Sequence, residues 1–251
     1  MIEIEGLAVD FQGRPILTDL SLHVPRGAFV ALVGRSGSGK TTLLKSINRL
    51  VTPTRGRIAI DGVEASALPA PEWRRRIGYA FQSVGLFPHM SVGENIAAVP
   101  ELLGWPPARI AARVRELVTL VDLPEDVASR PPRALSGGQA QRVGLARALA
   151  AEPRVMLLDE PFGALDPMTR DALGLAYRDL HERLGLTTIM VTHDIEEAML
   201  LTQRIVLMDE GRLVADLAPA DLAHSTDPRV TALIAPALRH AHRLRELTDG
   251  A

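Results

Sequence analysis

The sequence contains no cysteine among its 251 residues, and aromatic residues make up only 4% of it. The absence of cysteine excludes a disulfide-bonded scaffold, a thiolate metal site and a cysteine nucleophile. A reducing cytoplasm is the simplest compartment for such a chain. Hydrophobic residues nevertheless account for 47% of the sequence, which is enough for an aliphatic core and excludes an intrinsically disordered protein.

Long hydrophobic runs and an excess of one charge are also missing. Apolar stretches such as residues 29–33 are far shorter than the ~20 residues that span a membrane, so any membrane role is expected to be peripheral. The first residues include two glutamates where a signal peptide needs a basic start. With 28 Lys plus Arg against 30 Asp plus Glu, the net charge is −2, which argues against nucleic acid as a partner. The run Arg74-Arg75-Arg76 is expected to be a solvated helix face.

Short β-branched runs alternate with helical patterns along most of the chain. Residues 2–9 alternate as an edge strand would, whereas residues 29–33 form the continuous apolar run typical of the buried middle of a sheet. Further strands are predicted at 21–24, 57–60, 77–81, 155–159, 187–192 and 204–209, with helices at 40–50, 167–184 and from 194. The pattern predicts an α/β fold with a mostly parallel central sheet and an N-terminal antiparallel β part.

The pattern changes between residue 86 and about residue 151, where helical periodicity dominates and two Pro-Pro pairs mark loops. We interpret this stretch as a helical subdomain inserted into one domain that covers residues 1–235. Residues 236–251 are assigned to a C-terminal tail, and the chain from about Asp227 is expected to form a polar, solvated helix.

Residues 34–41, GRSGSGKT, match the phosphate-binding pattern G-x-x-x-x-G-K-[ST] and lie between a buried strand and a helix. Glycines let backbone N–H groups turn toward a polyphosphate, and the helix N-terminus adds a favourable field. Lys40 is expected to reach the β- and γ-phosphates, the Thr41 hydroxyl to bind Mg²⁺, and Thr42 to bond a neighbouring phosphate oxygen. The predicted nucleotide-binding residues here are Gly34, Arg35, Ser36, Gly37, Ser38, Gly39, Lys40, Thr41 and Thr42.

Two acidic residues, Asp159 and Glu160, follow the apolar run at 155–158. An acid at the end of such a strand completes the Mg²⁺ shell in phosphate-loop proteins, usually through a water, which predicts Asp159 as a metal residue. Glu160 would then lie beside the γ-phosphate, where a carboxylate can orient or deprotonate a water. Hydrolysis is therefore the predicted reaction, because the sequence lacks the Asn-Lys-x-Asp of a GTPase and residues for a kinase acceptor site.

The segment Leu135-Ser136-Gly137-Gly138-Gln139 opens another helix. Ser136 is a natural N-cap, and the two glycines expose amides at a second helix start of phosphate size. Taken alone, this pattern is better explained by helix capping than by phosphate binding.

Together these motifs resemble the nucleotide-binding subunits of the ATP-binding cassette (ABC) superfamily, from residue 2 to about residue 220. Residues 34–41 resemble the Walker A motif, Gln82 the Q-loop, 135–139 the ABC signature, 155–160 Walker B with its catalytic glutamate, 164–166 the D-loop and His193 the switch histidine. All six occur in family order. The resemblance implies ATP and Mg²⁺ as cofactors, catalytic roles for Glu160, His193 and Gln82, and Gln82 as a further Mg²⁺ ligand.

The resemblance also implies a dimer, either of two copies or with a similar ATPase subunit. In the family, two subunits pack head to tail, and each ATP lies between the Walker A motif of one chain and the signature of the other. Ser136, Gly137, Gly138, Gln139 and Asp166 are therefore expected to contact nucleotide across the interface. Phe11 lies where the family places an adenine-stacking aromatic, commonly Tyr, although ordinary packing is the alternative.

The segment that follows Gln82 resembles the family's docking region for membrane subunits. Its apolar residues Leu86, Phe87 and Met90 would face that partner, cover the core of the helical subdomain, or do both. Residues 85–105 and 159–170 look most like importers of quaternary-amine osmoprotectants of the glycine betaine, carnitine and choline type. The implied partners are transmembrane permease subunits and, indirectly, an extracytoplasmic solute-binding protein, with the chain at the cytoplasmic face of the membrane. The alternatives are an importer ATPase for another small polar solute, or a non-transport ABC ATPase that acts on nucleic acid.

Overall fold

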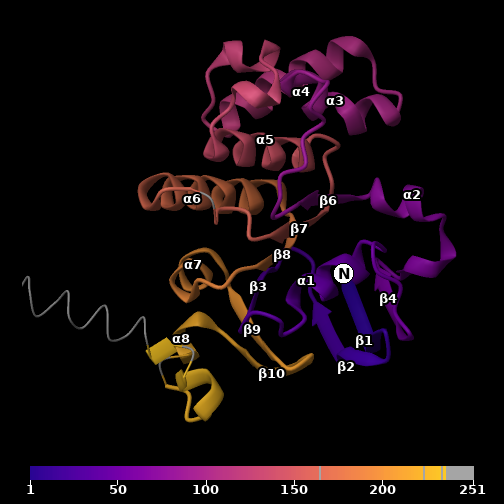
Figure 1. Ribbon diagram of the computed structural model, residues 1–251, viewed down its shortest axis with the longest axis vertical. Coiled ribbons are helices and arrows are strands. Elements are labelled where there is room, and N and C mark those ends of the chain that lie inside the picture. The colour runs from indigo at the N-terminus through magenta and orange to yellow at the C-terminus, as the bar shows by residue number, and fades with distance from the viewer. Residues whose placement is uncertain (164, 223, 233, 236–251) are drawn as a thin grey trace, which may run out of the picture.

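The computed structural model describes residues 1–163, 165–222, 224–232 and 234–235, and two β-sheets organise them (Figure 1). The larger sheet has six strands, and the antiparallel pair β9–β10 is joined at one edge to neighbours that all pair in parallel. Its order is β10 (Arg212–Leu217), β9 (Arg204–Asp209), β3 (Phe29–Val33), β8 (Thr187–Val191), β7 (Val155–Asp159) and β6 (Ile77–Ala80). This is the mostly parallel central sheet that the alternating pattern predicts, with β3 in its buried interior.

The smaller sheet is antiparallel and is built from the N-terminal part of the chain. Its order is β2 (Arg14–Val24), β1 (Ile2–Phe11), β4 (Arg55–Ile60) and β5 (Val63–Glu64). The prediction that residues 2–9 form an edge strand is wrong, because Ile2 pairs with Val24 on one side and with Ile60 on the other. The alternation shows that one face of β1 is buried, but it does not indicate whether β1 pairs with one strand or with two.

The helices cover the central sheet and extend from it. They are α1 (Lys40–Ile47), α2 (Ala70–Arg74), α3 (Val92–Leu102), α4 (Pro107–Leu120), α5 (Gly137–Leu149), α6 (Pro167–Leu184), α7 (Ile195–Leu201) and α8 (Pro219–Leu222), with 3-10 turns at Ala65–Ala67, Glu125–Ser129 and Pro132–Ala134. Figure 1 shows α3, α4 and α5 grouped at one end of the molecule and the N-terminal sheet toward the other. A capping box starts α3, since the Ser91 hydroxyl accepts from the Glu94 amide and the Glu94 carboxylate accepts from the Ser91 amide.

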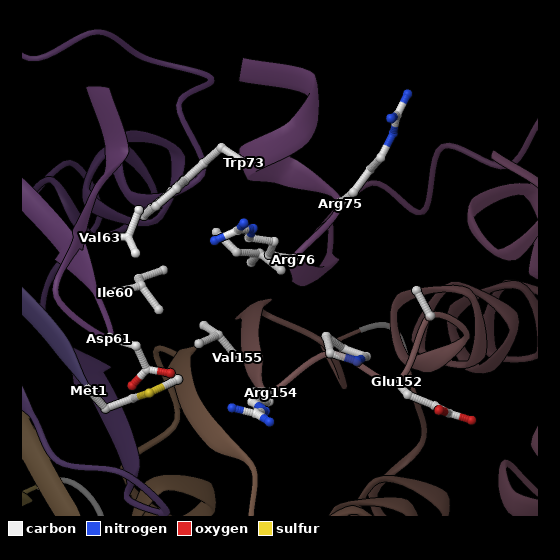
Figure 2. Close-up of a pocket in the computed structure, with 13 residues that line it drawn as sticks. Met1, Ile60, Asp61, Val63, Trp73, Arg75, Arg76, Glu152, Arg154 and Val155 are labelled. Atoms are coloured by element: carbon white, nitrogen blue, oxygen red, sulfur yellow. The ribbon is translucent and has the colours of Figure 1, made fainter. Parts of the chain in front are cut away.

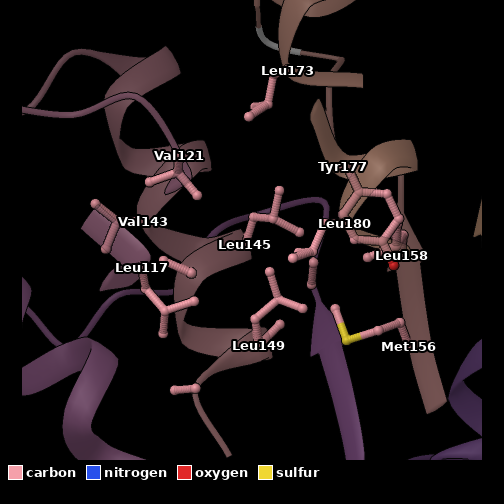
Figure 3. Close-up of a cluster of buried hydrophobic side chains, with 14 of the residues drawn as sticks. Leu117, Val121, Val143, Leu145, Leu149, Met156, Leu158, Leu173, Tyr177 and Leu180 are labelled. Atoms are coloured by element: carbon pink, nitrogen blue, oxygen red, sulfur yellow. The ribbon is translucent and has the colours of Figure 1, made fainter. Parts of the chain in front are cut away.

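The core lies on both faces of the central sheet, as the alternation along β7 shows. Met156 and Leu158 pack with α4, α5 and α6 in one cluster, whereas Val155 and Leu157 pack on the other side with α1 and the N-terminal sheet. In Figure 3, side chains of α4, α5 and α6 converge on Met156 and Leu158. The helices between residues 92 and 149 therefore share one hydrophobic core with the sheet.

The chain after Asp227 differs from the expected solvated helix. Residues 228–232 are helical, but Val230 and Ile234 are 1% and 5% exposed and pack with Ala31 and Val33 of β3. Val230 and Ile234 are four residues apart, so they lie on one face of a helix, and this face holds the segment against the sheet. The tail at 236–251 lies outside the described residues.

A buried polar chain joins α6 to the sheet beneath it. His181 is 1% exposed, and its Nε2 lies 3.1 Å from the Gly27 carbonyl oxygen, which can only accept. Nε2 therefore carries the proton, and Nδ1 accepts from the Thr188 hydroxyl at 3.0 Å. The Thr188 oxygen in turn accepts from the Tyr177 hydroxyl at 2.8 Å. This order of donors holds His181 in its neutral form, and burial lowers its pKa.

We expect His181 to make the protein acid-sensitive. In the unfolded chain a histidine has a pKa of about 6.5, so below that pH the unfolded state binds a proton that folded His181 refuses. The free energy of unfolding should therefore be highest above about pH 6.5 and should decrease as the pH falls below that value. Urea unfolding from pH 8 to 5 should show a shallower loss for His181→Gln than for the unsubstituted protein, whatever its absolute stability. His23→Gln, which changes an exposed histidine, should leave the slope unaltered; equal slopes for all three proteins would contradict the assignment.

Candidate functional site

The loop between β3 and α1 is shaped by close backbone approach. A Cβ at Gly34 would lie 2.1 Å from the Met208 carbonyl oxygen, so no other residue fits there without movement. Gly39 has a φ of 100°, in the left-handed region that favours glycine, and it precedes α1 without a side-chain cap. The first amides of α1 are thus left to a ligand rather than to a capping side chain.

Lys40 lies inside this loop. Its side chain is 7% exposed, and Nζ donates to the carbonyl oxygens of Gly34 at 2.8 Å and Arg35 at 2.9 Å, with the Ser38 hydroxyl at 3.4 Å. Burial lowers the pKa of Lys40, while the nearby charges of Glu160 and Asp159 raise it. A buried ammonium held by neutral carbonyls is a strong attractor for phosphate, because a phosphate supplies the full negative charge that carbonyls lack.

Asp159 ends β7 and faces the start of α1. It is 3% exposed, its Oδ1 accepts from the Thr41 hydroxyl at 2.9 Å, and its Oδ2 accepts from the Tyr79 hydroxyl at 3.5 Å. Burial raises the pKa of the Asp159 carboxyl, and burial followed by the charge of Asp159 raises the pKa of Tyr79, which keeps the phenol a donor. Tyr79 was not predicted as a site residue; it lies in a strand with nothing local to distinguish it.

The oxygens of Thr41 and Asp159 are the hard donors that suit Mg²⁺. Within the part of the chain that the structure describes, no group of three or more His, Cys, Asp or Glu side chains could hold a metal by itself. The donor set therefore fits a cation that keeps waters and takes its remaining oxygens from a bound phosphate, which is how Mg²⁺ is usually held.

Glu160 is fixed by its neighbours on both the backbone and the side chain. Its φ of 47° lies in the left-handed region, its amide donates to Val191 O at 3.0 Å, and its carbonyl accepts from Gln141 Nε2 at 3.0 Å. Its Oε2 accepts from Gln82 Nε2 at 3.1 Å and lies 3.5 Å from His193 Nδ1. A non-glycine residue in this conformation costs about 1–3 kcal/mol and is typical of sites where the surrounding structure aims a side chain.

A cleft of 620 Å³ joins these groups, in the size range of ligand sites. It is lined by Ile16, Ser36, Gly37, Gly39, Lys40, Thr41, Thr42, Gln82, Glu160 and His193. Only Ile16, an apolar residue of β2, is absent from the predicted set, and nothing in its local sequence marks it. Phe11 is 66% exposed at the end of β1 and does not line the cleft, so its stacking on adenine stays a prediction.

The segment 136–139 caps α5 and lies outside the cleft. The Ser136 hydroxyl accepts from the Gln139 amide at 3.2 Å, and Gln139 Oε1 accepts from the Ser136 amide at 3.0 Å, which together form a capping box. A Cβ at Gly137 would meet nothing within 4 Å, so this helix start is open on the side of Gly137. Within one chain, these residues do not reach the phosphate loop's cleft.

Asp166 caps α6, accepting from the Thr169 amide at 3.1 Å, and its hydrogen bonds with Thr169 lower its pKa. Beside it, Arg170 donates to Leu165 O at 3.2 Å and to Asp194 Oδ2 at 3.3 Å. Arg170 thereby ties the residue before Asp166 to the residue after His193. Sequence reasoning did not find Arg170, because its two partners lie in different loops.

The segment after Gln82 is held against α5. Arg147 donates to Val84 O at 2.5 Å and to Gly85 O at 2.8 Å, and Leu86 packs on the core cluster that contains α5. Phe87 is 44% exposed. Both alternatives for this segment thus have a structural counterpart: Leu86 covers the core, and Phe87 presents an apolar surface. None of the helices in the described residues has the length and apolarity required to span a bilayer.

Comparisons with known proteins agree with this geometry. The family model described as ABC transporter matches residues 17–163. The chain is 52% identical over 214 residues to the glycine betaine uptake system ATP-binding protein YehX of Escherichia coli, covering 85% of this chain and 70% of that protein. It is 47% identical to the carnitine transport ATP-binding protein OpuCA of Listeria monocytogenes over 88% of this chain, and it spans 56% of that longer relative.

Among solved structures, the chain is similar to an ATP-binding cassette in a dimeric post-hydrolysis state bound to ADP and Pi. The TM-score is 0.80 with 32% identity, over 87% of this chain and 99% of that one. These matches confirm the resemblance and the fold class that the sequence predicts. The chain therefore belongs to the ABC transporter family and is an ATPase subunit of that family.

Proposed function

We propose that this chain powers an importer of quaternary-amine osmoprotectants such as glycine betaine, carnitine or choline. The identity of 52% to a glycine betaine uptake protein supports the substrate class, as do relatives named for carnitine and choline transport. The arrangement of Gln82, Glu160 and His193 beside the phosphate loop is the observation that carries the chemistry.

ATP binding uses the loop amides and the buried ammonium of Lys40. The polyphosphate enters the cleft along Ser36, Gly37 and Gly39, and Lys40 exchanges its carbonyl partners for phosphate oxygens. Thr41 and Asp159 would hold Mg²⁺, which neutralises charge on the phosphates when bound. Gln82 can serve the metal and the base together, because its amide nitrogen donates to Glu160 and its oxygen is a suitable metal ligand.

Hydrolysis uses Glu160 as the residue that orients or deprotonates the attacking water. His193 approaches the same carboxylate oxygen as Gln82 and so fixes where the carboxylate points. Holding the base in one position makes the attack a pre-oriented step, and positioning together with electrostatic stabilisation supplies almost all of the catalysis in phosphoryl transfer.

A second subunit, either another copy or a similar ATPase, completes each site by bringing Ser136, Gly137, Gly138 and Gln139 to the γ-phosphate, with Asp166 at the same interface. The open helix start at Gly137 and the dimeric state of a structurally similar cassette support this arrangement. ATP then joins the two subunits, and its cleavage separates them, which gives two states of different affinity that can drive transport.

The exposed Phe87 supports docking to transmembrane permease subunits at the cytoplasmic face of the membrane, with a solute-binding protein on the far side. The competing hypothesis is an importer ATPase for another solute. It is favoured by relatives named for putrescine and for sulfate/thiosulfate transport, each 44% identical to this chain.

The test is ATP hydrolysis by the chain assembled with its permease and solute-binding subunits in lipid vesicles. Glycine betaine, carnitine or choline should raise the rate several-fold, whereas putrescine and sulfate should leave it unchanged. Stimulation by putrescine or sulfate alone would replace the proposed substrate class with theirs. Co-purification with nucleic acid and no permease would point to the non-transport alternative.

A further inference from the structure

A second pocket lies at the start of β6 and β7, opposite the end of β7 that leads into Asp159 and Glu160. It has a volume of 310 Å³ and opens where β6 and β7 begin, at Ile77 and Val155, whereas Asp159 ends β7 and accepts from Thr41 of the nucleotide cleft. Figure 2 shows its lining side chains coming from the N-terminal sheet, from the end of α2 and from the start of β7. None of the residues that line it belongs to the site already described.

One wall of this pocket is apolar. Ile60, Val63 and Trp73 form it on one side, and Val155 faces them (Figure 2). Trp73 is 1% exposed, and its indole N–H already donates to Ile47 O at 2.8 Å. The indole donor is therefore used inside the protein, and this wall offers a ligand apolar contact and no hydrogen bond from Trp73.

Among the residues that the structure describes, the acidic side chains that line the pocket form ion pairs, whereas its arginines do not. Its two acids are each neutralised by an arginine outside the lining: Asp61 by Arg26 at 2.7 Å, and Glu152 by Arg109 at 2.8 Å. Its three arginines, Arg75, Arg76 and Arg154, have no ion pair or side-chain hydrogen bond within the described ranges of the chain. The pocket therefore has a net positive charge available to a ligand.

Two of these arginines are placed to hold an anion. Figure 2 shows the Arg76 guanidinium directed across the pocket toward Ile60 and Val63, with Arg154 on the side of Val155, whereas Arg75 points away. A guanidinium binds carboxylate and phosphate oxygens through paired N–H groups. The basic run at 74–76, expected as a solvated helix face, crosses the end of α2 at Arg74, so Arg75 and Arg76 lie beyond the helix and are exposed.

We propose that this pocket binds a small organic anion with an apolar body: a carboxylate or phosphate monoester whose head lies between Arg76 and Arg154 and whose apolar part contacts Ile60, Val63 and Val155. The volume is at the lower end of the range of small-molecule sites, which suits a ligand smaller than a nucleotide. None of the residues that line this pocket takes part in the proposed ATP site, so the inference stands apart from the proposed function.

The experiment uses four probes with matched parts: hexanoate, hexyl phosphate, hexan-1-ol and inorganic phosphate. The full chain carries Trp105→Phe, so that Trp73 is the one tryptophan that remains of the two in the sequence. Its emission, excited at 295 nm, then reports on the pocket wall. MgADP is kept present to occupy the phosphate loop, and calorimetric titration of the same samples measures binding independently of fluorescence.

We expect saturable binding of hexanoate or hexyl phosphate, at least about fivefold tighter than that of hexan-1-ol and inorganic phosphate. The tighter of the two probes shows whether the ligand is a carboxylate or a phosphate monoester. The double variant Arg76→Gln/Arg154→Gln should weaken it about tenfold or more, whereas Arg75→Gln, which removes the same charge from the same run, should change it less than about twofold. The proposal is overturned if neither amphipathic anion binds by either method, if inorganic phosphate binds equally well, or if Arg75→Gln weakens binding as much as the double variant.

Discussion

Glu160→Gln is expected to lower ATP turnover by about 100-fold or more while MgATP still binds within about threefold of the unsubstituted affinity. Glutamine keeps the shape and an oxygen that can accept from Gln82, but it can no longer take a proton from water or carry the charge that orients it. Phosphate release measures turnover, and equilibrium titration with MgATP measures binding. The variant saturated with MgATP should also sediment as a dimer, since it blocks the cleavage that we propose separates the subunits.

The matched control is Glu210→Gln. Glu210 shares the left-handed backbone of Glu160, with a φ of 45°, but its side chain is exposed and lies outside the cleft. Turnover by this control should stay within about twofold of the unsubstituted protein, because exposed substitutions away from a site have small effects. Near-normal turnover by Glu160→Gln would remove Glu160 from its assigned role.

His193→Ala should slow turnover by about tenfold or more, again with little effect on MgATP binding. The histidine ring lies 3.5 Å from Glu160 Oε2, so its loss frees the carboxylate to turn away from the water. If His193 acts through Glu160, adding His193→Ala to Glu160→Gln should cost little further. Full additivity of the two substitutions in phosphate release would instead indicate independent roles.

Lys40→Ala is expected to weaken MgATP binding by about 100-fold or more, which is about 2.7 kcal/mol. The ammonium is buried in the loop, and Lys40 is the one Lys or Arg among the described residues that line the cleft, so its loss removes the positive charge that we expect to meet the β- and γ-phosphates. Equilibrium binding of MgATP measures the effect, in contrast to Glu160→Gln, where binding survives and turnover does not.

Lys45→Ala provides the comparison, because Lys45 lies on the same helix and does not line the cleft. Its affinity for MgATP should stay within about threefold of normal. Since Lys40 Nζ bonds three loop acceptors, the melting temperature of Lys40→Ala without nucleotide must be measured as well. A folded Lys40→Ala protein that binds MgATP normally would exclude the lysine from the phosphate site.

The parts of the site that could be predicted are those whose signal is local. A glycine loop between a strand and a helix, and an acid at the end of an apolar strand, fix the geometry within a few residues, and the cleft contains Lys40, Thr41 and Glu160 as expected. The same holds for the central sheet, whose strands differ visibly from the helices that separate them.

The parts that could not be predicted depend on contacts between distant segments. Tyr79 donates to Asp159, 80 residues later, and Arg170 donates to Leu165 in one loop and to Asp194 in another. The residues next to Tyr79 and Arg170 in the sequence therefore do not indicate these contacts. The interior position of β1 follows from pairing with β4, about fifty residues later, which alternation cannot encode.

The capping box at Ser136 uses the hydroxyl of this side chain as an acceptor and does not use it as a donor. The hydroxyl oxygen is engaged by the Gln139 amide, yet its own hydrogen is not required by the cap, so one group can end a helix and still offer a proton to an incoming anion. Glycine at an N-cap sacrifices only a few tenths of a kcal/mol. Ser136→Gly would thus preserve the architecture of α5 while deleting that one donor, which separates what the residue contributes to folding from its proposed contact with the nucleotide of a second subunit.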